Sequence, residues 1–147
     1  MIKNLNHVGF TVSNLNNSIK FYKDVLNFKL FNKSKRSKKF SEKVTGIKNA
    51  RLNIAYMKLN NFYLELIEYQ TGKGIKIKTS VNNIGTVHVC FNLKNFDKYL
   101  SELLSKKVEF VGEPTIIPAG PNKGKQVVYV QDIDNNKLEF ISVNKII

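Results

Sequence analysis

One short motif occurs twice in this chain, at residues 7–12 (HVGFTV) and 88–93 (HVCFNL). The two histidines of the protein, His7 and His88, open the two copies. A glutamate between apolar residues follows each copy: Glu65 in the segment LELI and Glu139 in the segment LEFI. The same residue types at matched places are typical of an internal duplication. The sequence therefore predicts two similar modules whose pseudo-symmetry assembles one site.

The segments around these four residues alternate apolar side chains with others, which predicts β-strands because successive side chains of a strand point to opposite faces. In the first copy Val8, Phe10 and Val12 form one row, and His7 lies in the other. The second copy and both glutamate segments repeat this alternation. All four His and Glu residues are thus predicted opposite an apolar row. If that row covers helices, the His and Glu face is the concave inner side of a sheet.

A helix is predicted after each histidine strand. Asn14 and Asn95 can cap helices over about 15–26 and 96–104, where apolar residues recur every three or four positions. Further strands are predicted at 28–32, 51–59, 62–69, 108–111, 126–131 and 137–143, with tight turns at 60–61 and 134–136. The predicted order in each module is βαβββ.

The 147 residues are the size of one ordinary domain that buries its own core. The predicted organisation is a single domain over 1–147, with module 1 at about 1–71, a linker at about 72–83 and module 2 at about 84–147. The loop 112–125 holds all three prolines and is long enough to cover a pocket.

Composition favours a cytoplasmic protein. The chain starts without the apolar run of a signal peptide, and no stretch approaches the roughly 20 apolar residues of a membrane-spanning helix. We therefore predict no membrane partner. The single cysteine, Cys90, cannot form an internal disulfide, which fits a reducing compartment. Cys90 lies on the face of His88, and we interpret it as a small buried thiol.

A net charge of +13 attracts anions through long-range fields. Nucleic acid is not the predicted partner, because only two of the 24 Lys and Arg residues are arginines, Arg36 and Arg51, and nucleic-acid readers depend more on arginine forks. The densest basic run, Lys33–Lys39, is interpreted as a solvated loop that could also attract a phosphate or carboxylate tail.

Several segments together carry a family resemblance: LNHV at 5–8, FYKDVLNF at 21–28, LEL at 64–66, GTVHV at 85–89 and YVQDIDNNKLE at 129–139. With these segments the chain resembles the vicinal oxygen chelate superfamily, which contains glyoxalase I, methylmalonyl-CoA epimerase, extradiol dioxygenases, fosfomycin-resistance enzymes and bleomycin-resistance proteins. The resemblance spans nearly the whole chain. It is specific for the fold and much less specific for the reaction.

The resemblance implies an α+β fold in which two βαβββ modules form an open, cup-shaped, eight-stranded barrel around one divalent metal ion. His7, Glu65, His88 and Glu139 match the four ligand positions of glyoxalase- and epimerase-type members. Imidazole and carboxylate donors suit Zn, Ni, Co, Mn or Fe, and two carboxylates neutralise a dication. The resemblance also implies a homodimer, because family members cover open sheet edges by pairing.

For the reaction, the resemblance favours a metal-dependent lyase or isomerase of the glyoxalase I or epimerase type, in which Glu65 or Glu139 moves a proton next to a metal-bound carbonyl. Dioxygenases and fosfomycin enzymes of this family ligate through two histidines and one glutamate, whereas this chain offers a second glutamate. An Fe(II)-dependent ring-cleaving dioxygenase is one alternative, because Tyr129 resembles the active-site tyrosine of those enzymes. A protein that binds a small molecule, such as an antibiotic-resistance protein, is another. The predicted substrate is a small, anionic metabolite of unidentified structure.

Overall fold

A computed structural model describes residues 1–146, so that Ile147, the last residue of the predicted second module, lies outside the described residues. The chain forms two compact units, unit 1 (Met1–Lys76) and unit 2 (from Ile77 onward). Each unit holds its own mixed sheet and its own copy of the repeated motif. The division between the units lies within the segment 72–83.

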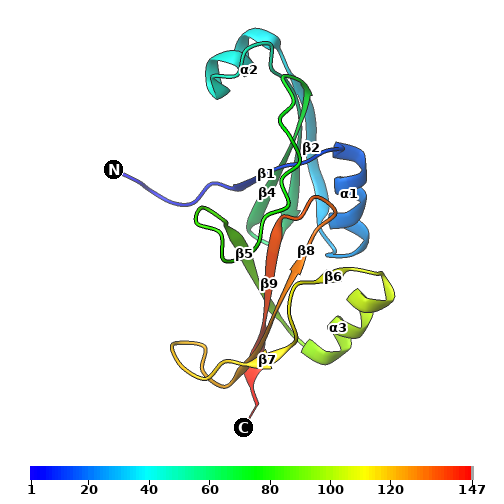
Figure 1. Ribbon diagram of the computed structural model, residues 1–147, viewed down its shortest axis with the longest axis vertical. Coiled ribbons are helices and arrows are strands. Elements are labelled where there is room, and N and C mark those ends of the chain that lie inside the picture. The colour runs from blue at the N-terminus through cyan, green and yellow to red at the C-terminus, as the bar shows by residue number, and fades with distance from the viewer. Residues whose placement is uncertain (147) are drawn as a thin grey trace. The chain divides into compact units, whose positions relative to one another are not determined.

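Unit 1 contains β1 (Val8–Thr11), α1 (Leu15–Asp24), β2 (Lys29–Arg36), α2 (Lys38–Thr45), β3 (Arg51–Leu59) and β4 (Phe62–Thr71). Its strands run in the order β1-β4-β3-β2, with β1 parallel to β4 and the other pairs antiparallel (Figure 1). The buried row of this sheet includes Leu64, Leu66 and Met57, and α1 adds Tyr22. This is the alternation that the sequence predicts, with the apolar row beneath a helix and His7 and Glu65 on the other face.

Unit 2 contains β5 (His88–Leu93), α3 (Phe96–Ser105), β6 (Glu109–Phe110), β7 (Thr115–Ile116), β8 (Lys125–Gln131) and β9 (Lys137–Lys145). The strand order is β5-β9-β8-β6, with β7 paired to β8 and β5 parallel to β9. Leu138, Phe140 and Val130 form the buried row, and Tyr99 of α3 packs its ring 5.7 Å from that of Phe140. The order of unit 1 is therefore repeated in unit 2.

The α+β class is confirmed, and two elements depart from the predicted βαβββ pattern. Strand β7 adds a ninth strand inside the segment 112–125, which was predicted to be a loop. Helix α2 lies between β2 and β3, where no helix was predicted. The closing of the two sheets into one eight-stranded cup stays a prediction, because each unit is described by itself.

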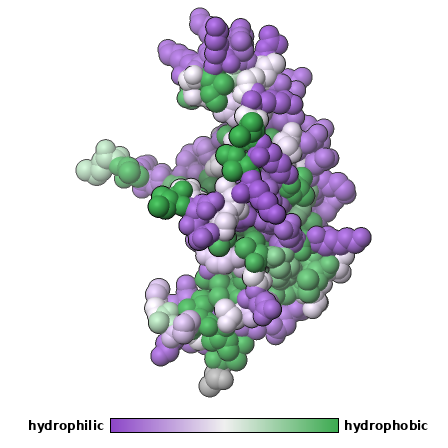
Figure 2. Space-filling view, in the orientation of Figure 1, coloured by the Kyte–Doolittle hydropathy of each residue, from purple (hydrophilic) through white to green (hydrophobic). Residues whose placement is uncertain are grey.

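The basic run Lys33–Lys39 is not a solvated loop. Its first part belongs to β2, and its last part starts α2 after Ser37, whose hydroxyl accepts a hydrogen bond from the backbone N–H of Phe40 at 3.3 Å. Gly46 ends α2 in the left-handed conformation, at φ 71°. Hydrophilic residues predominate around α2 in Figure 2, and the apolar Phe40 and Val44 of the helix are also exposed. The strand predicted at 28–32 in fact continues to Arg36. Strand pairing and the Ser37 cap satisfy the backbone groups of the basic run.

The predicted caps differ in outcome. The Asn14 side chain accepts a hydrogen bond from the backbone N–H of Asn17 at 2.9 Å, as a cap should. Asn95 precedes α3 but adopts a left-handed φ of 54° and makes no side-chain capping bond, so that this prediction was wrong. The two predicted hairpin turns are confirmed, with Asn60 at φ 52° and Asn135 at φ 67°.

Candidate metal centre

In unit 1, β1 and β4 bring together the first predicted pair of ligands. Gly9 pairs with Glu65 across the two parallel strands, and His7 lies just before β1 on the same face. The Nε2 atom of His7 is 3.2 Å from the Oε2 atom of Glu65. The other ring nitrogen, Nδ1, is 2.7 Å from the Oδ1 of Asn6. This contact with Asn6 orients the imidazole, as the outer partner of a metal-binding histidine commonly does.

Unit 2 repeats this arrangement with the second pair. Cys90 pairs with Glu139 across β5 and β9, and His88 starts β5. The Nε2 atom of His88 is 3.1 Å from the Oε2 atom of Glu139. The His88 side chain is 44% exposed and that of Glu139 is 14% exposed, so that a partly buried carboxylate lies beside an accessible imidazole.

A tyrosine completes each pair. Tyr129 lies directly across β8 and β9 from Glu139, with its ring 5.1 Å from that of His88 at an interplanar angle of 84°. Tyr56 lies directly across β3 and β4 from Glu65, with its ring 5.5 Å from that of His7 at 88°. Sequence reasoning singled out Tyr129 as a candidate site residue and treated Tyr56 only as apolar pocket material. The available signal was the duplication itself, since each glutamate strand is preceded by a strand that carries a tyrosine.

The hydroxyl groups of both tyrosines face carboxylates. Partial burial and a hydrogen bond to Glu65 raise the pKa of Tyr56 to about 12, although Arg36 nearby acts in the opposite direction. Partial burial and the negative charge of Glu139 raise the pKa of Tyr129, and its hydroxyl oxygen is also 3.4 Å from the Nε2 of His88. Both phenols are therefore protonated at neutral pH and donate to the glutamates, which holds the carboxylates in place.

Cys90 is exposed, so that the predicted buried thiol was wrong. The reason is the strand alternation: Cys90 lies on the face of β5 opposite α3, together with His88. Although the residue is exposed, its thiol is partly shielded from water, and this desolvation together with the neighbouring Glu139 raises the pKa of the Cys90 thiol to about 12. The group is therefore a neutral S–H donor to the Glu139 carboxylate and not a thiolate.

The geometry of each pair fits two ligands of one metal ion. Two donors held about 2.1 Å from an ion, roughly 100° apart, lie about 3.2 Å from each other. The His–Glu distances of 3.2 Å in unit 1 and 3.1 Å in unit 2 match that separation. Within either unit, the described residues gather no group of three or more His, Cys, Asp or Glu side chains that could hold a metal. Each unit thus supplies two donors, which is fewer than a stable protein site uses.

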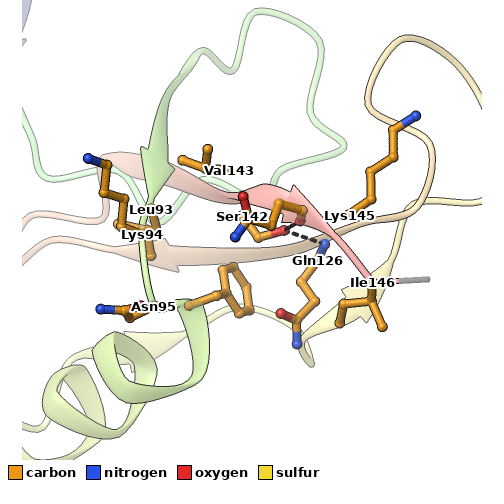
Figure 3. Close-up of a pocket in the computed structure, with 10 residues that line it drawn as sticks. Leu93, Lys94, Asn95, Gln126, Ser142, Val143, Lys145 and Ile146 are labelled. Atoms are coloured by element: carbon orange, nitrogen blue, oxygen red, sulfur yellow. Dashed lines mark hydrogen bonds between the residues drawn. The ribbon is translucent and has the colours of Figure 1, made fainter.

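A cavity of about 360 Å³ lies elsewhere in unit 2, where β5 passes into α3 beside the end of β9 (Figure 3). Phe96, Gln126 and Ser142 are among its lining residues, and the Gln126 backbone N–H donates to the Ser142 hydroxyl at 2.9 Å. Ser142 points to the face of β9 opposite Glu139, because the two residues are an odd number of positions apart. This cavity is therefore separate from the unit 2 ligand pair.

Matched His and Glu pairs on two mixed sheets of the same strand order define a protein of duplicated βαβββ modules. A family model described as the Glyoxalase/Bleomycin resistance protein/Dioxygenase superfamily matches residues 4–140. The chain belongs to this superfamily, and the resemblance found in the sequence is confirmed.

The relatives found by sequence are named as metallothiol transferases. The metallothiol transferase FosB of Staphylococcus epidermidis is 28% identical over 142 residues, which covers 95% of this chain and 81% of the relative. FosB of Staphylococcus haemolyticus is also 28% identical, over 143 residues that cover 95% of this chain and 84% of that protein.

Solved structures share the fold at lower identity. A glyoxalase family protein from Bacillus cereus aligns with a TM-score of 0.82 at 21% identity, covering 97% of this chain and 95% of that one. The fosfomycin resistance protein FosX from Listeria monocytogenes, complexed with Mn(II) and sulfate, aligns with a TM-score of 0.65 at 19% identity, covering 98% and 95%. The prediction of a divalent metal cofactor agrees with these metal-dependent relatives. No helix within residues 1–146 is long and apolar enough to cross a membrane.

Proposed function

We propose that this protein is a metal-dependent enzyme that modifies a small anionic molecule, of the fosfomycin-resistance type, rather than a glyoxalase- or epimerase-type lyase or isomerase. The observation that carries this proposal is the match to metallothiol transferase FosB over 95% of the chain. Together with the likeness to the fosfomycin resistance protein FosX, that match favours the resistance-protein alternative of the sequence analysis. Fosfomycin itself, a phosphonate with an epoxide ring, is the first substrate to test.

His7, Glu65, His88 and Glu139 are the proposed metal ligands. The paired His–Glu distances support them, and neutral imidazole with carboxylate suits Mn, Zn, Ni, Co or Fe. A bound divalent ion supplies a Lewis acid that draws electron density from an epoxide or phosphonate oxygen.

We propose that the remaining residues orient the metal ligands and attract the anionic substrate. The hydroxyls of Tyr56 and Tyr129 hold the glutamates in position, and the single O–H donor of each phenol is directed at its carboxylate. A cation acts on the His–Glu pair of each unit. The charge of Arg36 acts to lower the pKa of Tyr56 in unit 1, and that of Lys125 acts to lower the pKa of Cys90 in unit 2. These cations favour an anionic substrate.

A glyoxalase- or epimerase-type reaction is the second candidate, because one observation favours it. Glu65 repeats the position of Glu139 beside its histidine, and a second carboxylate is the base that proton transfer next to a carbonyl requires. In that case Glu65 or Glu139 would remove the proton at the carbon next to the carbonyl. A proton would then return to the neighbouring carbon in a glyoxalase-type reaction, or to the opposite face of the same carbon in an epimerase-type reaction.

The test begins with metal analysis of the purified full chain, reconstituted with Mn, Zn, Ni, Co or Fe(II). We expect a bound ion, and less than about a tenth of an equivalent with every metal would contradict the proposed ligands. The loaded protein is then incubated with fosfomycin, with and without a thiol such as L-cysteine, and followed by ³¹P NMR.

Loss of the fosfomycin signal with the wild-type protein, but not with Glu139→Gln, supports the proposal. Parallel assays use a glutathione hemithioacetal for the lyase reading and a catechol with Fe(II) for the dioxygenase reading. Turnover in one of these assays, with fosfomycin unchanged, would replace the proposal with that reading.

A further inference from the structure

The ligand face of unit 1 carries a polar row on β2. Asn32 lies directly across from Tyr56, which lies directly across from Glu65, so that the three side chains share one face of the sheet. By strand alternation Ser34 and Arg36 continue that row. Lys33 belongs to the opposite face, where its Nζ donates to Asn16 of α1 at 2.7 Å.

Hydrogen bonds connect the row from end to end. The Nη1 atom of Arg36 donates to the Ser34 hydroxyl at 2.6 Å, and that hydroxyl donates to the Oδ1 of Asn32 at 3.2 Å. The Arg36 guanidinium is therefore turned along β2 toward the Asn32 and Tyr56 positions. The positive charge of Arg36 acts to lower the pKa of Tyr56, against the larger effects of burial and Glu65.

The Arg36 guanidinium has hydrogen-bond donors that the fold does not use. Its bond to Ser34 takes one of five N–H donors, and among residues 1–146 no carboxylate lies within ion-pair distance of Arg36. The side chain is half-buried, which reduces the screening of its charge by water. A partly buried arginine with donors to spare, on the face of the sheet that carries a candidate metal ligand, is suited to bind a planar or tetrahedral oxyanion.

We propose that Arg36, held by Ser34, is the residue that binds the anionic group of the substrate, with a phosphonate or a similar compact oxyanion as the ligand. This inference rests on the proposed function and names the part of the substrate that β2 recognises. It also gives the basic run of β2 a role: Lys33 and Lys35, although they lie on the other face, raise the local positive potential.

Binding of methylphosphonate tests the inference without any turnover, because this probe has no epoxide. Calorimetry on the metal-free and the Mn(II)-loaded full chain should show that Arg36→Gln weakens binding by about 10- to 100-fold, the usual loss for a charged hydrogen bond. Arg36→Lys should weaken binding less, because lysine keeps the positive charge and loses only the paired donors of the planar guanidinium. The Arg36→Lys variant also keeps the inference testable if Arg36→Gln fails to fold.

The matched control is Arg51→Gln, which removes the other arginine of the chain and the same amount of charge from an exposed position at the start of β3. Methylphosphonate binding that falls equally in both Gln variants, or in neither, would overturn the inference. If binding depends on Arg36 but no variant converts fosfomycin, the inference stands and the proposed function fails. If wild type and Arg36→Gln convert fosfomycin equally, the proposed function stands and the inference about Arg36 fails.

Discussion

At the scale of single residues, the duplication includes a tyrosine beside each His–Glu pair as well as the pair itself. His7 with Glu65 and His88 with Glu139 each have a tyrosine whose ring lies edge-on to the imidazole and whose hydroxyl bonds to the carboxylate. A hydrogen bond to a ligand fixes its orientation, and such outer partners commonly contribute to metal affinity. The two tyrosines are therefore expected to act alike in the two units.

Replacement of Tyr56 or Tyr129 by Phe should lower metal affinity by about 10- to 100-fold, because the ring remains and only the hydrogen bond to the glutamate is lost. Competition with a chromophoric chelator measures the affinity. Tyr63→Phe, on the same face of β4 but cation–π-paired with Lys58, is the control and should leave the affinity unchanged. A loss confined to one of the two units would contradict an equal role for both.

Tyr56 also makes a prediction about pH. Its pKa is raised in the folded protein to about 12, from an ordinary value of 10.0, so that the folded state holds this proton more tightly than the unfolded state does. The resulting stabilisation is fully present below pH 10 and disappears as the pH rises from 10 through 12. The difference in absorbance at 295 nm between wild type and Tyr56→Phe should therefore titrate near pH 12. A difference curve centred near pH 10 would contradict the partial burial of the Tyr56 hydroxyl beside Glu65.

At the scale of elements, short polar side chains decide where helices start. Asn14 and Ser37 accept from backbone N–H groups of α1 and α2, whereas Asn95 occupies the same place before α3 and does not cap. Asn95 instead supplies a left-handed φ, which asparagine tolerates better than most residues. The same residue type thus has two different uses before two equivalent helices.

The two asparagines should respond differently to substitution. Asn14→Ala should lower the free energy of unfolding by about 1 kcal/mol, the usual value of a lost N-cap. Asn95→Gly should change it by less than about 0.5 kcal/mol, because glycine accepts the positive φ and no capping bond is lost. Urea denaturation of both variants measures the difference. Equal losses would mean that Asn95 does cap α3 in solution.

At the scale of the whole molecule, apolar residues outside the two cores remain exposed. They include Met1, Ile2, Leu5, Ile75 and Ile84. Figure 2 shows the hydrophobic N-terminal end of unit 1 standing out from the hydrophilic surface. Exposed apolar segments of this kind favour burial against another chain.

We predict a homodimer on this basis. Light scattering at micromolar concentration should give twice the chain mass of 16.9 kDa, because the apolar N-terminal and linker residues and the open sheet edges gain by pairing. Replacement of Ile2 and Leu5 by Ser should weaken the dimer, and replacement of exposed Lys98 should not. A monomer of 16.9 kDa for the wild type would contradict the prediction.

Metal binding should stabilise the fold as a whole. An ion present at a hundred times its dissociation constant adds about 2.7 kcal/mol to the free energy of unfolding, because it binds the folded state only. Mn(II) should therefore raise Tm, and EDTA should reverse the change. The double variant His7→Ala, His88→Ala should show no rise, and a rise equal to that of wild type would place the metal elsewhere.

The sequence by itself determined the α+β class, the repeated module and the faces of His7, Glu65, His88 and Glu139. Period-2 alternation and duplicated motifs are local patterns, and they report which side of a strand each residue occupies. The sequence did not reveal α2, β7, the exposure of Cys90 or the role of Tyr56. Those depend on which strands become neighbours: Tyr56 meets Glu65 only through the β3–β4 register, and Cys90 is exposed only because α3 covers the other face. Pairing across a sheet joins residues distant in the chain, so that only the tertiary structure decides it.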